Sequence, residues 1–104
     1  MLDNAPFKID ILPSAIVDIV QMRVFYDGIE SGLGAVFKEH IIEEIDKLET
    51  SAGIDEMREG YYFRHEKRFH QGIYYKLDDR KVIVWRVLDT RFNPKRIREA
   101  LTNI

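Results

Sequence analysis

The sequence has 104 residues, of which 45% are hydrophobic and 12% aromatic. This size and composition predict one domain with a modest core. There is no cysteine, which excludes disulfides, thiolate zinc sites and cysteine nucleophiles. Residues 1–10 contain no long apolar run, so we expect neither a signal peptide nor a membrane span, and a location in the cytoplasm.

The formal net charge of −2 hides an uneven distribution. Residues 1–60 hold 5 Lys+Arg and 13 Asp+Glu, whereas residues 61–104 hold 11 and 5. Such a split predicts one acidic face and one basic face, and a basic face attracts nucleic acid or an acidic protein. The alternative is an ordinary soluble surface on which the split arose by chance.

The first half of the chain begins with a strand pattern and continues with a helix pattern. Residues 7–12 alternate apolar and polar side chains, which predicts a strand with one wet face. Residues 14–29 predict a helix for which Ser14 can act as N-cap. Its apolar stripe is expected from Ile16, Ile19, Val20 and Val24.

Residues 33–52 have the most regular pattern. Apolar side chains recur every three or four positions, as on the buried face of a helix: Leu33, Phe37, Ile41, Ile45, Leu48 and Ala52. The helix should end near Gly53. A short loop containing glycine separates it from the preceding helix, so the two should form an antiparallel hairpin.

After residue 60 the apolar period changes to two, which predicts strands. The expected strands cover 61–65, 69–77 and 81–89. A tight turn at 78–80 joins the last two. Residues 82–85 are apolar on both faces, so their strand should be central. A final helix should begin at Pro94, a residue favoured in the first helical turn.

These elements predict a two-layer α+β domain over residues 1–104 with the order β-α-α-β-β-β-α. The helical hairpin should pack its apolar stripes on one face of a small, mostly antiparallel sheet. The opposite face should then be polar or bind a ligand.

Basic side chains concentrate near the ends of the predicted strands. Alternation places Arg86 on the same strand face as Val84. We expect Arg64, Arg86 and Arg91 to gather at one face and edge of the sheet, where guanidinium groups suit phosphate or carboxylate. The bland alternative for each arginine is a solvated charge or a rim salt bridge. Further basic residues for binding a target or antitoxin are Lys67, Arg68, Lys95, Arg96 and Arg98.

Other chemistry finds little support in the sequence. The three histidines, His40, His65 and His70, are too sparse for a metal site, so we expect no metal and no cofactor. The tyrosines of the predicted strands could stack on bases, but aromatic strand residues more often belong to a core. They are Tyr61, Tyr62, Tyr74 and Tyr75.

The element order and several stretches resemble the RelE/ParE toxin superfamily of bacterial type II toxin–antitoxin systems. The stretches are "LPSAIVDIVQMRVFYDGIESGLGAVF", "REGYYFRH", "FHQGIYYKLDDRKVIVWRVLDTR" and "NPKRIREAL". The resemblance covers roughly residues 7–101, and its most specific part is "VIVWRVL-x-x-R-x-x-P". The pattern "Y-x-x-x-x-x-G-L-G-x-x-F" is closer to the ParE, plasmid-stabilisation branch.

The resemblance implies a small toxin that an antitoxin, encoded beside it, neutralises in a hetero-oligomer. ParE-type members act on DNA gyrase, whereas RelE-type members cut messenger RNA on the ribosome without metal. Gyrase inhibition is the leading expectation, an mRNA endoribonuclease is the alternative, and a non-toxic protein-binding domain is the third. A nuclease would use Arg91 with Arg64, Arg86 or His65, because such cleavage needs proton transfer and charge stabilisation.

The match to the family's functional residues is incomplete. Arg91 matches an arginine that follows the last strand in both branches. His65, Gly72 and Ile97 stand where RelE-type enzymes carry a lysine, an arginine and a tyrosine. Asp89 stands where the ParE branch often carries a histidine. Two groups of the nuclease, the arginine and the tyrosine, are therefore missing, which favours the gyrase hypothesis.

Overall fold

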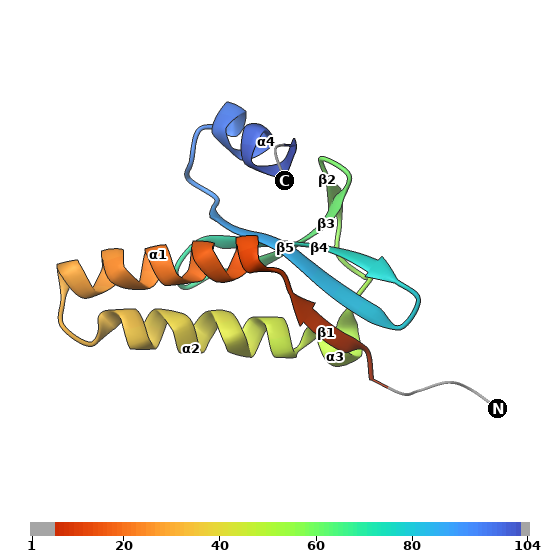
Figure 1. Ribbon diagram of the computed structural model, residues 1–104, viewed down its shortest axis with the longest axis horizontal. Coiled ribbons are helices and arrows are strands. Elements are labelled where there is room, and N and C mark those ends of the chain that lie inside the picture. The colour runs from red at the N-terminus through yellow and green to blue at the C-terminus, as the bar shows by residue number, and fades with distance from the viewer. Residues whose placement is uncertain (1–5, 103–104) are drawn as a thin grey trace.

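The computed structural model describes residues 6–102 and confirms the predicted order of elements (Figure 1). The short strand β2 was not predicted, and the short helix α3 was predicted only as part of the helix over residues 33–52. The elements are β1 (Lys8–Ile11), α1 (Pro13–Ile29), α2 (Leu33–Asp46), α3 (Leu48–Ser51), β2 (Met57–Arg58), β3 (Tyr61–Glu66), β4 (Gln71–Asp78), β5 (Lys81–Asp89) and α4 (Pro94–Thr102).

The five strands form one sheet with the order β1-β5-β4-β3-β2. β1 runs parallel to β5, and the other neighbours are antiparallel. β5 lies between β1 and β4, which confirms that residues 82–85 belong to an internal strand.

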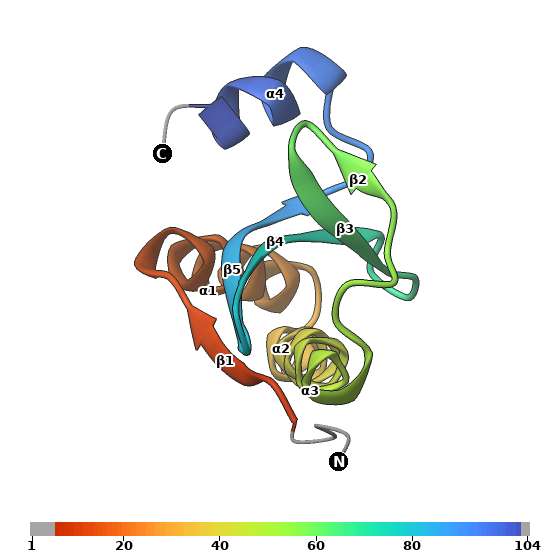
Figure 2. The same ribbon diagram turned by 90° about the vertical axis from the view of Figure 1, so that its right-hand side faces the viewer.

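The main core lies between the hairpin of α1 and α2 and one face of the sheet (Figure 2). The stripe predicted for the second helix is confirmed, since Phe37, Ile41, Ile45 and Leu48 are fully buried. Burying each of these side chains stabilises the fold by roughly 1.5–3 kcal/mol. The helix predicted over 33–52 breaks at Lys47, so Leu48, which continues the stripe, belongs to α3 rather than α2.

The stripe predicted for α1 is wrong at three of its four positions. Ile19 is buried, but Ile16, Val20 and Val24 are 49%, 53% and 67% exposed. The face that packs on the sheet and α2 instead carries Ala15, Asp18, Ile19 and Tyr26. Apolar residues occur on every side of this helix, so spacing alone could not select the buried side.

The opposite face of the sheet is aromatic and is covered by α4, which lies across the sheet from α1 and α2 (Figure 2). Of the two expected alternatives, a polar face or a ligand-binding face, the polar face is therefore wrong. A second apolar cluster fills this interface: Tyr61, Phe63, Tyr74, Leu88 and Leu101, with Trp85, Ile97 and Ala100 at its margin. The prediction that the strand tyrosines belong to a core holds for Tyr61, Tyr74 and Tyr75.

A bulge in β5 changes the faces that its side chains occupy. Tyr74 pairs with Arg86 and Tyr75 with Val84, so Trp85 has no partner in β4. The extra residue breaks the alternation of the strand. Val84 and Val87 consequently both reach the main core. The predicted placement of Arg86 on the face of Val84 is therefore wrong.

The start of α1 continues the edge of the sheet where β1 ends. Leu12 N donates to Val84 O at 3.0 Å, and Ser14 Oγ donates to Trp85 O at 2.6 Å. Asp18 Oδ2 then accepts a hydrogen bond from Val87 N at 3.0 Å. The prediction that Ser14 is the N-cap of α1 is therefore wrong, because the N-cap is Leu12. The Ser14 hydroxyl satisfies a strand carbonyl instead.

Candidate functional site

Arg86 joins α1, β5 and α4. Its Nε and Nη2 donate to Asp18 Oδ2 and Oδ1 at 2.7 and 2.8 Å, and Nη1 donates to Ala100 O at 3.0 Å. The paired hydrogen bonds to Asp18 raise the pKa of Arg86, although burial opposes the rise. The third bond satisfies a carbonyl in the last turn of α4, where a cation is favourable. Arg86 thus connects the two layers of helices.

Arg64 lies in a different polar network, next to α2 and α3. Its Nε donates to Asp55 Oδ1 at 2.8 Å, and Nη2 donates to Ser51 Oγ at 3.0 Å. Tyr75 also donates its hydroxyl hydrogen to Asp55. Burial raises the pKa of the Tyr75 hydroxyl well above its usual range, and the bond to Asp55 raises it further. This network fastens the loop before β2 to the sheet.

Arg91 is held by the residue two positions before it. Its Nη2 and Nε donate to Asp89 Oδ2 and Oδ1 at 2.6 and 2.9 Å, and Nη2 also reaches Tyr26 Oη at 3.5 Å. Burial works to raise the pKa of Asp89, but the hydrogen bonds from Arg91 outweigh it and leave that pKa lowered. The Asp89 side chain is 6% exposed and that of Arg91 58%.

The prediction that Arg64, Arg86 and Arg91 gather at one rim is wrong. Arg64 contacts the α2–α3 region, whereas Arg86 and Arg91 contact α1. Each is paired with a carboxylate whose side chain is at least 87% buried: Asp55, Asp18 and Asp89 respectively. The first two pairings could not be predicted from the sequence, because their partners come from other elements. These three arginines therefore do not form a free anion site.

The other positions considered for catalysis, His65 and Gly72, do not supply the groups that the three arginines fail to provide. His65 is exposed and stacks on Phe63, and its ring centroid is 6.5 Å from that of His70. A Cβ atom at Gly72 would lie 2.5 Å from Phe63 Cε1, so the arginine of RelE-type enzymes could not be accommodated there without movement of that ring. Within residues 6–102, no three His, Asp or Glu side chains are grouped to hold a metal ion.

The remaining basic residues lie in two places. Lys67 and Arg68 occupy the β3–β4 turn, where Arg68 Nη1 is 3.0 Å from His40 Nε2. Lys95, Arg96 and Arg98 lie on α4. The guanidinium of Arg96 stacks on Phe92, with its Cζ 3.9 Å from the ring centroid.

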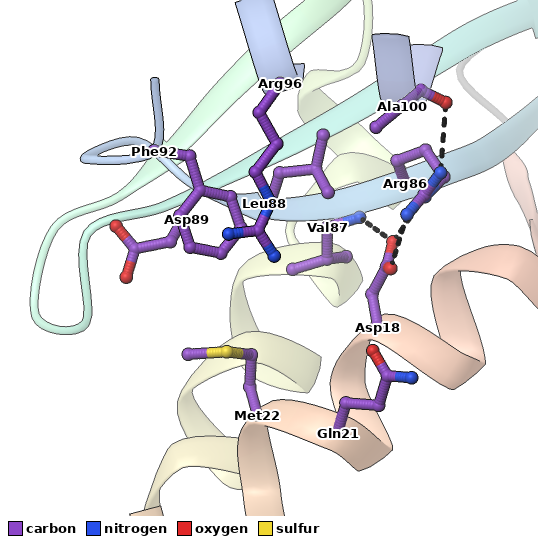
Figure 3. A pocket seen from close by; sticks show the side chains of 10 residues that line it. All are labelled: Asp18, Gln21, Met22, Arg86, Val87, Leu88, Asp89, Phe92, Arg96 and Ala100. Carbon is purple, nitrogen blue, oxygen red and sulfur yellow. Dashed lines mark hydrogen bonds and ion pairs between the residues drawn. The ribbon is translucent and has the colours of Figure 1, made fainter. Parts of the chain in front are cut away.

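A narrow hollow of about 120 Å³ opens between α1, the end of β5 and α4 (Figure 3). Asp18 reaches upward from α1 to Arg86 and the backbone of Val87, while Arg96 descends from α4. Met22 and Phe92 supply apolar walls. The hollow brings Arg86 and Arg96 to one region, but Arg86 is already paired with the buried carboxylate of Asp18.

The exposed side of α1 is a second candidate surface. Ile16, Val17, Val20 and Val24 are each about half exposed or more. Beside them an apolar groove of about 190 Å³ separates α1 from α2. The charged side chains in its lining are both cationic, and the full lining is Ile11, Ile16, Ile19, Val20, Arg23, Lys38 and Ile42. We did not predict this surface from the sequence, because we assigned Ile16, Val20 and Val24 to the buried face of the helix.

The fold and these surfaces define an α+β domain with a mostly antiparallel five-stranded sheet and an exposed apolar helix face. No family model matches the chain, and no curated protein matches it. None of the helices between residues 6 and 102 combines the length and the apolar composition that a membrane-spanning helix requires.

Proposed function

We propose that the chain is the toxin of a type II toxin–antitoxin pair of the plasmid-stabilisation kind, which works in the cytoplasm by binding DNA gyrase and is neutralised by an antitoxin. The observation that carries this proposal is the exposed apolar face of α1, formed by Ile16, Val17, Val20 and Val24. A contiguous apolar patch on a soluble protein marks an interaction site more often than isolated exposed residues do. The element order adds support through its likeness to the toxin family.

The arginine contacts favour binding over catalysis. A metal-free nuclease needs groups that are free to stabilise charge and move protons at one place. Arg64, Arg86 and Arg91 instead neutralise buried carboxylates, and no imidazole in the described residues lies in their hydrogen-bond networks. A chain built in this way is better suited to holding a protein partner.

The groove between α1 and α2 suggests the chemistry of that partner. Its floor is apolar, and Arg23 and Lys38 flank it. An amphipathic helix with acidic margins would bury its apolar face there and pair its carboxylates with the two cations. We assign this groove to the antitoxin.

The test is expression of the chain alone and with its neighbouring reading frame, followed by supercoiling assays with purified gyrase. We expect growth arrest and loss of supercoiling with the chain alone, and relief of both by the co-purifying neighbour. A chain that neither arrests growth nor affects gyrase contradicts the proposal. Primer extension on cellular messages serves as the parallel measurement for RNA cleavage.

One observation favours the nuclease alternative. A hollow of about 320 Å³ on the α4 side of the sheet is lined by Arg58, Tyr74 and Arg98, among others. Arg98, together with Arg58, which is also paired with Glu56, lies beside aromatic rings and could hold a strand of RNA. If the chain cuts messages, Arg58→Ala and Arg98→Ala should abolish the cuts, whereas Arg64→Ala should act only through stability. Intact messages during growth arrest exclude this alternative.

A further inference from the structure

We infer that the chain has a second docking surface, between α1 and α4, that takes an acidic peptide segment with one aromatic anchor from a protein partner. The surface is a hollow of about 370 Å³ lined by Met22, Phe25, Asp89, Arg91, Phe92 and Arg96. The inference rests on the proposed function only in taking the chain to act by binding proteins.

Both guanidinium groups in this hollow are held in place before any partner arrives. Asp89 and Tyr26 fix the Nε and Nη2 edge of Arg91, which leaves Nη1 without a hydrogen-bond partner in the described residues. Arg96 is held by stacking on Phe92, and no carboxylate among residues 6–102 pairs with it. Ordered guanidinium donors bind carboxylates at a lower entropic cost than mobile lysines do.

The burial of Asp89 matters for the charge that a partner meets. Its side chain is 6% exposed and lies beneath Arg91, whose side chain is 58% exposed. A partner therefore meets the more exposed guanidinium before the carboxylate. Because Asp89 also lines the hollow, the two guanidinium groups leave it with one net positive charge.

Between these cations the floor is apolar. Phe25 is 56% exposed, and its ring is held edge-on against Tyr26, with centroids 5.2 Å apart. Phe92, from the segment before α4, and the flexible thioether of Met22 complete the apolar lining. Aromatic, Met and Arg side chains are the residues enriched at the centres of protein interfaces.

The occupant follows from this arrangement. A flat apolar side chain would enter between Phe25 and Phe92, where aromatic rings favour edge-to-face or offset contacts. Carboxylates on either side of that anchor would meet Arg91 and Arg96 in paired hydrogen bonds. The partner segment is therefore acidic, with a Phe, Tyr or Trp at its centre.

This surface and the α1–α2 groove use different sides of α1. The two linings share no residue: α1 contributes Val20 and Arg23, among others, to the groove, whereas it contributes Met22 and Phe25 to the hollow. A variant in one can therefore serve as the control for the other.

The experiment is a titration of the ¹⁵N- and ¹³C-methyl-labelled full chain with an acetylated Glu-Asp-Phe-Asp-Glu amide, followed by NMR. We expect shifts at the Met22 methyl group, the Phe25 amide and the Arg96 side chain, and affinity that weakens as salt rises. Replacing the central Phe by Ala, or the acids by Lys, should abolish binding. Arg96→Ala and Phe25→Ala should each weaken it about tenfold, whereas Val20→Asp should leave it unchanged.

Several outcomes overturn the inference. They are shifts confined to other surfaces, equal binding by the Ala-centred peptide, and concentration-dependent shifts of the same residues without peptide, which would assign the hollow to a second copy of the chain. The result is independent of the gyrase assay. Peptide binding without any effect on gyrase would reject the proposed target and retain this surface, and the reverse result would reject this surface alone.

Discussion

Arg86 and Asp18 are 68 positions apart in the sequence, yet their side chains form two parallel hydrogen bonds of 2.7 and 2.8 Å. The same carboxylate accepts the backbone N–H of Val87, which no strand reaches because β1 has ended. Asp18 therefore satisfies the open edge of β5 and the guanidinium at once. This contact explains how a helix can lie directly against a strand edge without leaving its polar groups unpaired.

Asp18→Asn tests how much the fold depends on that contact. The amide keeps the shape of the side chain but loses its charge and one acceptor oxygen. Arg86 is then left partly buried without a counter-ion, which costs about 2–4 kcal/mol when burial is incomplete. We expect a free energy of unfolding lower by that amount in urea denaturation.

The control for this variant is Glu56→Gln, which removes an exposed ion pair and leaves the Arg58 guanidinium on the Phe63 ring. Arg58 pairs with Glu56 at the surface, where both side chains are about half exposed or more. Such a pair contributes less than about 1 kcal/mol. Equal losses in the two variants would show that the Arg86–Asp18 pair is no more important than a solvated one.

We expect alanine substitutions at Gly28 and Gly34 to change the stability of the fold in opposite directions. A Cβ atom at Gly34 would lie 2.3 Å from the backbone oxygen of Arg23, because α1 and α2 approach most closely there. Gly28 lies in α1 with nothing within 4 Å of its Cβ position. We expect Gly34→Ala to destabilise by about 1–3 kcal/mol and Gly28→Ala to stabilise by up to about 1 kcal/mol. Thermal unfolding of both variants measures this, and a shift of the same sign in both would contradict the packing described for the hairpin.

The lowered pKa of Asp89 predicts that the folded chain loses stability in acid. Its pKa in the folded chain lies below the ordinary value of 3.8, because the hydrogen bonds from Arg91 outweigh the effect of burial. A group with a lowered folded-state pKa contributes stability that is present above the unfolded pKa, here about pH 4. That stability is lost as the pH falls through the folded-state value.

The measurement is urea unfolding between pH 6 and pH 2 for the natural chain and Asp89→Asn. The variant should be less stable at pH 6, and its stability should fall less steeply below about pH 4. Other carboxylates contribute to the acid slope of both proteins, so the difference between the two curves is the quantity to compare. Parallel curves would remove Asp89 from the acid transition.

The sequence predicted the buried face correctly for those elements whose apolar side chains fall on one side only. The α2 stripe repeats at helical spacing and has polar residues elsewhere, so its buried face follows from the pattern alone. β5 is apolar on both faces, and its internal place in the sheet is confirmed. α1 is apolar on all sides, and its buried face was decided by packing against β5 and α2. That contact is not local and leaves no period in the sequence.

The candidate site was harder to predict for two physical reasons. The bulge at Trp85 reverses the faces of the residues after it, and no glycine or proline marks its position. The partners of Arg64 and Arg86 come from distant elements, so counting cations could not show that their charge is already neutralised. Of the three arginines, Arg91 alone has a partner, Asp89, close enough in sequence to have been suspected.

The exposed face of α1 supplies the last prediction. Val20→Asp and Val24→Asp replace side chains that are 53% and 67% exposed, so each should change the free energy of unfolding by no more than about 0.5 kcal/mol. If the proposed antitoxin helix binds this face, the new carboxylates would meet its apolar side, and we expect at least about tenfold weaker binding of the neighbouring gene product in calorimetry. Ile19→Ala is the contrasting variant: Ile19 is buried in the core, so this change should cost about 2–5 kcal/mol of stability. Unchanged antitoxin binding by the folded Val20→Asp, Val24→Asp double variant would show that the exposed face of α1 is not the antitoxin surface.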